Sequence, residues 1–387
     1  MHWLEQLTCF GQDLPLYHAE RNTDIELRLS KDGQFLGTSI GRVRAFIPVT
    51  ERSASRTSAI LPHALSDRLQ YLWGGKRTEM YLEALRRWAD SEYGCQELHA
   101  VYSYIKGGSI IRDITSDGTE LSGLYNSMVR FSVDGKALWE DVKLRESYIS
   151  YMRSRQDALR LCHITGRMTA AAQQCPAELL GSRAKLISRE EGKRIVWRGR
   201  TADSRDIFSA GYEPLFCLHR VLSRMVTEHG MRCGSRVFLS WDEDGVCHTL
   251  LPQKHRAAPC GTVTVIGLDE VTRGRVSVTF LRRLCGELFS ERLSLVSVPF
   301  KRIAELAFGR RCAGGYSCDG GLLAQTVERL LGAVLDGRKV AGDIMTALRQ
   351  RSSGDPEAAQ ALDVLSEYNR HAAERGRICA EKQIFSP

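Results

Sequence analysis

The chain lacks most of the short motifs by which enzymes and metal proteins are identified. Its 12 cysteines are spread from Cys9 to Cys379 without a CxxC pair, so neither a zinc site nor a disulfide framework is indicated. It contains no GxxxxGK[ST] phosphate loop and no HExxH pair, the spacings that would predict nucleotide or metal chemistry. We therefore expect a non-enzymatic protein without catalytic residues, metal or cofactor.

Long apolar runs and a signal segment are also missing. No stretch approaches the roughly 18–20 apolar residues that a membrane-spanning helix needs. A secretory signal has a basic region followed by an apolar run. The amino-terminal MHWLEQLTCF has neither feature in that order. The sequence therefore predicts a cytoplasmic protein without a membrane partner.

Lysine is scarce relative to arginine, and acids are fewer than bases. The chain has 54 Lys and Arg residues against 46 Asp and Glu, a net charge of +8 over 387 residues. Guanidinium groups favour planar, bidentate contacts with phosphate, so this balance indicates an anionic partner. An arginine-rich surface that is merely solvated fits the same numbers. The length suggests two domains, with one elongated domain as the alternative.

The strongest positive cluster follows Ser182. Only Glu190 and Glu191 oppose its basic residues, which are Arg183, Lys185, Arg189, Lys193, Arg194, Arg198 and Arg200. Clustered cations of this kind can grip a phosphate backbone. We take Arg183, Lys185, Arg198 and Arg200 as candidate nucleic-acid contacts, with ion pairs to acids of neighbouring subunits as the alternative.

Hydrophobic periodicity predicts an α+β fold without internal repeats. Period-two patterns at 24–29 and 34–40 flank Lys31-Asp32-Gly33 and predict a hairpin, with a third strand at 43–49. Further strands are expected at 236–241, 262–268 and 275–281. Helical spacing predicts helices at 64–73, 77–90, 96–105, 144–160, 212–229, 321–334, 340–350 and 356–374. We expect a mixed sheet-and-helix body with a helical carboxy-terminal portion.

By function, the sequence suggests three regions. Residues 1–160 form an α+β region with candidate DNA-contacting loops. Residues 161–312 combine the basic strands and loops with a helix and a second small sheet. Residues 313–387 form the helical carboxy-terminal region.

Two segments carry donors suited to nucleic acid. The polar stretch Thr50–His63 predicts a surface loop, whose candidate contacts are Arg52, Ser53, Ser55, Arg56, Thr57 and Ser58. Its guanidinium and hydroxyl groups could lie along phosphates or enter a groove, although an ordinary solvated loop has the same composition. Lys106-Gly107-Gly108 would let a backbone approach a phosphate closely, and glycines also commonly end a helix.

Other motifs fit structural roles better. Tyr71, Trp73 and Trp197 could unstack bases during duplex opening, but most aromatics pack in the core. Cys162-His163 with Cys175 lacks a fourth ligand. The run WDEDG at 241–245 predicts a hairpin turn rather than a metal site. His63 and Asp67 are expected to form a cap or a helix-surface pair.

Several segments, in collinear order over most of the chain, resemble the large subunit of type I-C CRISPR interference (Cascade) complexes. They are LPLYH (14–18), TERSASRTSAILPHALSDRLQYL (50–72), YLEALRRWADSEY (81–93), AVYSYIKGGSII (100–111), LCHITGRMTAAAQQCPAELLGSRAKLIS (161–188), RGR (198–200), GYEPLFCLHRVLSRMVTEHGMRCGSRVFLSWD (211–242) and LLGAVLDGRKVAGDIMTALRQ (330–350).

The resemblance implies a non-catalytic subunit of a crRNA-guided surveillance complex for antiviral defence. Such a subunit recognises the protospacer-adjacent motif in double-stranded DNA, aids duplex opening and R-loop formation, and helps to recruit the helicase-nuclease. Base pairing between the guide RNA and the target strand recognises most of the DNA sequence. The implied partners are crRNA, target double-stranded DNA, and the backbone and handle-binding Cascade subunits, with a separate small subunit and a helicase-nuclease or transposition factor as further candidates.

The resemblance also implies a departure and leaves alternatives. The family subunit closes in a long terminal helical bundle, whereas this chain stops at IFSP soon after residue 378. We expect a shortened form without that bundle: a compact variant, a system with a separate small subunit, or one that binds DNA without destroying it. An RNA-processing enzyme and a stand-alone DNA-binding regulator remain the competing interpretations.

Overall fold

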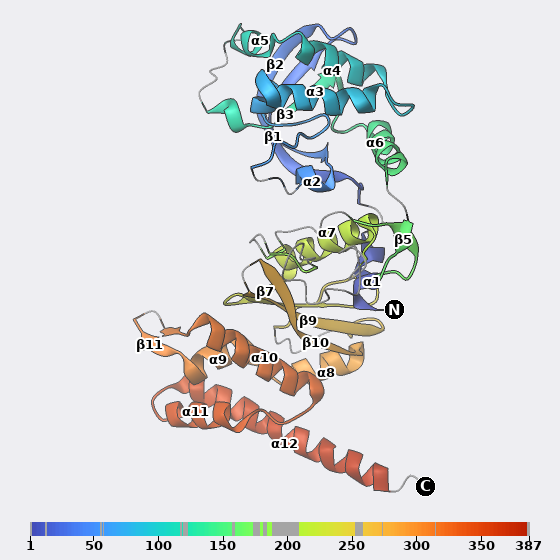
Figure 1. Cartoon of the computed structure of the whole chain (residues 1–387). Helices are drawn as coiled ribbons and strands as arrows, with labels where there is room; N and C mark the ends of the chain where they lie inside the picture. The colour runs from blue at the N-terminus through green and yellow to red at the C-terminus, as the bar shows by residue number, and fades with distance from the viewer. Residues whose placement is uncertain are drawn as a thin grey trace, which may run out of the picture. The chain divides into compact units, whose positions relative to one another are not determined.

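The chain forms two compact units. The computed structural model describes residues 2–11, 14–54, 56, 58–116, 118, 123–156, 159–172, 179–180, 184–187, 209–251, 258–272, 274–313 and 315–384. The N-terminal unit comprises Asp13–Pro176 and Arg189–Phe216, and the C-terminal unit comprises Met1–Gln12, Ala177–Ser188 and Cys217–Pro387. Figure 1 shows their elements. The functional division into 1–160, 161–312 and 313–387 stays a prediction.

A four-stranded sheet organises the N-terminal unit. Its strands are β1 (His18–Leu29), β2 (Phe35–Pro48), β3 (Val129–Val133) and β4 (Lys136–Ala137), in the order β2-β1-β3-β4. β1 runs antiparallel to β2 and parallel to β3. Ile25, Leu27 and Leu29 of β1 are fully buried, because alternate residues of a strand face the same side of the sheet.

The predicted β1–β2 hairpin is confirmed, but the separate third strand is wrong. Gly33 adopts a φ of 77° in the turn, and a Cβ there would meet the carbonyl oxygen of Ala100 at 2.7 Å, so glycine is required. The expected strand at 43–49 continues β2, since the pairing with β1 resumes at Thr23 and Val43 after a bulge and runs to its end.

Helices pack on this sheet (Figure 1). They are α3 (Gly75–Ala89), α4 (Gln96–Lys106), α5 (Ile110–Ser116) and α6 (Val142–Ser154). Tyr81, Leu85 and Trp88 recur at helical spacing in α3 and are buried, and the Tyr104 ring of α4 stacks on Phe35 with centroids 6.1 Å apart. The predicted helices at 77–90 and 96–105 are confirmed, whereas the one expected at 144–160 ends at Ser154.

The predicted helix at 64–73 is wrong. The segment between β2 and α3 holds only the one-turn helix α2 (Glu51–Ala54) and the 3-10 turn η1 (Leu69–Tyr71). The Asp67 carboxylate accepts the backbone N–H groups of His63 and Arg68 at 2.8 and 2.7 Å. Such local side-chain bonds compete with helix formation. The backbone of Asp67 and Leu69 pairs with residues 127–129, which follow the 3-10 turn η2 (Leu124–Asn126).

A short hairpin and a long helix lie between residues 159 and 229. β5 (Leu159–Leu161) pairs with β6 (Met168–Ala170), and α7 (Tyr212–His229) has the bounds predicted from the sequence. Of the predicted basic segment at 183–200, only 184–187 are described.

The C-terminal unit contains a second antiparallel sheet. Its strands are β7 (Met231–Cys233), β8 (Arg236–Trp241), β9 (Thr262–Thr272) and β10 (Arg275–Cys285), in the order β10-β9-β8-β7. They confirm the strands predicted at 236–241, 262–268 and 275–281. The helix α1 (Trp3–Phe10) joins this unit through Trp3, whose ring lies 6.5 Å from that of Trp241.

Helices and a small hairpin follow the second sheet (Figure 1). They are α8 (Gly286–Ser294), α9 (Phe300–Phe308), β11 (Arg310–Cys312), β12 (Gly315–Ser317), α10 (Gly320–Asp336), α11 (Gly342–Ser352) and α12 (Pro356–Ile384). Their apolar faces share one core with the sheet, which includes Phe238, Phe300 and Leu330. The expected α+β fold with a helical carboxy-terminal portion is therefore confirmed.

Within the described ranges, none of the helices is both long enough and apolar enough to cross a membrane.

Candidate nucleic-acid interface

The loop after β2 begins with a reciprocal turn. The Ser53 hydroxyl accepts the Thr50 N–H at 2.9 Å, and the Thr50 hydroxyl accepts the Ser53 N–H at 3.1 Å. Such an exchange satisfies two of the free amides at a helix start. Ser53 is buried and its hydroxyl also contacts the His63 ring at 2.9 Å. Its side chain therefore holds the loop from inside.

Arg56 and Asp67 form the centre of this loop. The guanidinium makes a two-pronged ion pair with the carboxylate, with one nitrogen at 2.8 Å, and also donates to the Leu61 carbonyl at 2.7 Å. Its carbon lies 4.4 Å from the centre of the Tyr71 ring. The side chains are 11% and 0% exposed. Arg56, a predicted nucleic-acid contact, is thus engaged with the protein itself.

His63 lies beside this ion pair as a buried, neutral side chain. Burial lowers the pKa of His63 to about 3, against the opposing effect of the Asp67 charge. A positive imidazole would face desolvation here. The expected His63–Asp67 contact exists, but it runs from the His63 backbone N–H to the carboxylate rather than between side chains on a helix.

Other cations of the same region face outward. Arg52 and Ser58 from the predicted set are exposed, whereas Ser55 and Thr57 lie outside the described residues. Three further exposed cations, which sequence reasoning missed, are Arg68, Lys76 and Arg77. Within the described part of the chain, no carboxylate forms an ion pair with Arg52 or with these three. In the sequence, Lys76 and Arg77 directly follow Trp73-Gly74-Gly75, a glycine pair that indicates a turn at the surface.

Lys106, Gly107 and Gly108 form the exposed end of α4. Gly107 caps the helix, and Gly108 has a φ of 71° with no atom within 4 Å of where its Cβ would lie. The Lys106 ammonium lies 5.7 Å from the centre of the Tyr102 ring. The helix-end interpretation is confirmed, and phosphate binding by this segment stays a prediction.

From the predicted basic block, Lys185 alone is described. Its backbone N–H donates to the Gly274 carbonyl at 3.1 Å, and its carbonyl accepts the Val276 N–H at 2.9 Å. The segment thereby forms a β-bridge with Arg275 at the edge of β10. Both hydrogen bonds use the backbone of Lys185 and do not involve its ammonium group. Arg183, Arg198 and Arg200 lie outside the described residues.

The predicted aromatic wedges differ in exposure. Tyr71 is 6% exposed and packs under Arg56, whereas Trp73 is 49% exposed. Trp197 lies outside the described residues. Trp73 is therefore the accessible ring of the two described ones.

The acidic run at 241–245 forms the turn predicted from its sequence. The buried Asp242 carboxylate accepts the N–H groups of Asp244 and Val246 at 3.0 and 2.9 Å, and Gly245 adopts a φ of 81°. The second carboxylate oxygen lies 2.9 Å from Nε2 of His248. These contacts use both oxygens of Asp242 to close the turn.

The other chemical motifs are part of the scaffold where they are described. Cys162 is buried, and its sulfur accepts the Gly211 N–H at 3.2 Å, while Cys175 lies outside the described residues. The segment Gly37–Gly41 has GxSxG spacing but lies inside β2 rather than at a strand-to-helix elbow. Among the described residues, no group of three His, Cys, Asp or Glu could hold a metal.

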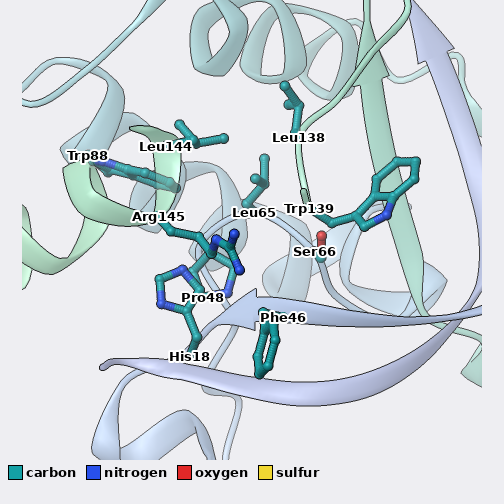
Figure 2. Close-up of a pocket in the computed structure, with 10 residues that line it drawn as sticks. All are labelled: His18, Phe46, Pro48, Leu65, Ser66, Trp88, Leu138, Trp139, Leu144 and Arg145. Carbon is teal, nitrogen blue, oxygen red and sulfur yellow. The ribbon is translucent and has the colours of Figure 1, made fainter. Parts of the chain in front are cut away.

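A small pocket of the N-terminal unit lies beside β1, β2, α3 and α6 (Figure 2). Its lining is His18, Phe46, Pro48, Leu65, Ser66, Trp88, Leu138, Trp139, Leu144 and Arg145. Arg145 packs 5.8 Å from the centre of the Phe46 ring, and the His18 ring lies 2.7 Å from the Leu16 carbonyl. This mostly apolar lining joins α6 to the sheet, so we place the nucleic-acid interface at the exposed cations instead.

Comparison with known proteins identifies a family. The sequence model of the family described as CRISPR-associated protein (Cas_Csd1) matches residues 5–295, most of the chain. No curated protein matches the chain.

Proposed function

Because the chain belongs to the family of CRISPR-associated proteins (Cas_Csd1), we propose that it is the large subunit of a type I-C Cascade complex. In this role it binds double-stranded DNA beside a crRNA guide, recognises the protospacer-adjacent motif and aids R-loop formation. Its partners are the backbone and handle-binding subunits. We further propose that it is not itself catalytic.

The observation that carries this proposal is a braced loop with free cations on its outside. The Arg56–Asp67 pair and the Ser53–His63 contact hold the loop from within. Arg52 and Arg68 are exposed on it. Because the loop that carries them is already held in place, these guanidinium groups can contact phosphates and base edges without the loop losing much further conformational entropy. A subunit that needs to recognise only a short motif requires few such contacts.

The direct test replaces two outward cations in the assembled complex. Arg52→Ala with Arg68→Ala should weaken binding to motif-bearing duplex in a gel-shift titration and leave assembly intact. The slope of affinity against salt should fall by about 0.9 for each lost phosphate contact. A matched control is Arg87→Ala, because Arg87 is occupied by Glu83 at 2.7 Å on α3. Unchanged affinity and slope in the double variant would contradict the proposal.

The non-catalytic assignment has its own test. The purified chain is incubated with labelled RNA and a divalent metal, and we expect no cleavage. RNA turnover that disappears on Asp242→Asn or Asp244→Asn would identify an RNA-processing enzyme instead.

A further inference from the structure

Two large aromatic rings lie together on the surface of the N-terminal unit. Trp73 is 49% exposed and Tyr125 is 46% exposed. Their ring centroids are 6.3 Å apart with an angle of 84° between the planes, so one ring meets the other edge to face. Two exposed rings in contact form a larger apolar patch than the single exposed side chains common on protein surfaces.

The segments that carry these rings are fastened to each other. The Leu69 N–H donates to the Ser127 carbonyl at 2.9 Å. The Gln70 side-chain amide donates to the Asn126 side chain at 2.7 Å. Rings held by such bonds can accept a flat partner with little ordering of the protein.

Three cations lie near Trp73 in the sequence. Arg68 precedes it by five residues, and Lys76 and Arg77 lie in the first turn of α3, which holds no acidic residue. The guanidinium carbon of Arg77 lies 6.0 Å from the centre of the Tyr71 ring. All three are exposed. Between Trp73 and Lys76, Gly74 and Gly75 have no atom within 4 Å of where a Cβ would lie. The patch therefore combines flat apolar surface with positive charge, which suits a base and its phosphates.

We propose that Trp73 and Tyr125 form a stacking platform for an unpaired nucleotide of single-stranded DNA, with its phosphates against Arg68, Lys76 and Arg77. Every base presents a flat π face, so stacking tolerates any sequence. The inference rests on the proposed function, in which duplex opening supplies unpaired nucleotides. It adds the site that receives one of them.

The test compares two oligonucleotides of equal charge on the assembled complex. One is an oligo-dT of roughly 12 nucleotides that is not complementary to the guide, and the other is its abasic counterpart. We expect tighter binding of the oligo-dT. Trp73→Ala should lower oligo-dT affinity about 5- to 150-fold and leave abasic affinity unchanged. Trp73→Phe should retain most of the difference, and Ile40→Ala, which removes a 51% exposed side chain of β2, should retain all of it.

The outcomes separate the platform from the proposed function. Equal binding of both oligonucleotides by the unmodified complex, with duplex binding preserved, overturns the platform alone. A Trp73→Ala chain that loses a partner subunit but keeps its oligo-dT preference also overturns it, because the rings are then a protein contact. A complex that binds neither duplex nor oligonucleotide overturns the proposed function as well.

Discussion

Removing the Arg56 guanidinium should destabilise the N-terminal unit far more than removing that of Arg52. In Arg56→Ala the Asp67 carboxylate, 0% exposed, loses its ion pair. Breaking a buried pair in this way costs about 3–5 kcal/mol. The contact with the Tyr71 ring at 4.4 Å is lost too. Arg52→Ala removes an exposed side chain and should change the free energy of unfolding by no more than about 0.5 kcal/mol.

The assay is urea unfolding of the full chain, with a double-mutant cycle. Asp67→Ala also deprives the His63 and Arg68 amides of their acceptor, which adds roughly 1–3 kcal/mol per group left buried. The double variant Arg56→Ala with Asp67→Ala should cost clearly less than the sum of the two single changes. Additive costs, or an Arg56→Ala variant as stable as Arg52→Ala, would refute the reasoning.

Two further predictions concern pH and salt. Because burial lowers the pKa of His63 to about 3, the unfolded state binds its proton first, near a pKa of about 6.5. The free energy of unfolding should therefore fall by up to about 1.4 kcal/mol per pH unit as the pH drops below about 6.5, and His63→Gln should lack this fall. If the free energy of unfolding changes with pH in the same way in both proteins, this prediction is wrong. Replacing Lys185, Arg198 and Arg200 by Ala should flatten the salt dependence of DNA or guide binding. If the salt dependence of neither DNA binding nor guide binding changes, these three residues do not contact nucleic acid.

The elements with regular apolar spacing were predictable from sequence. α7 and β8 have the bounds that the pattern gave, because burial of one face sets the period. The prediction of two strands within β2 was wrong because Gly41 and Arg42 interrupt the apolar alternation at the bulge. Pairing with β1 nevertheless continues beyond the bulge. The helix at 64–73 failed because Asp67 binds nearby backbone amides.

The candidate interface shows a sharper limit. Arg52 and Arg56 are equivalent in composition, yet one faces solvent and the other pairs with Asp67. That choice depends on how the loop folds back on itself, which periodicity does not encode. Arg68 falls inside the helix predicted at 64–73, Arg77 begins the helix predicted at 77–90, and Lys76 lies between the two, so the pattern gave no sign that these cations are exposed near Trp73.

The most direct measurement compares duplex binding by complexes assembled with and without this chain. The proposal predicts that the complex without it still pairs its guide with single-stranded target but loses affinity for motif-bearing duplex. Adding back the purified chain should restore that affinity, and adding the Arg52→Ala, Arg68→Ala form should restore less. Equal duplex binding in the presence and absence of the chain would contradict the account.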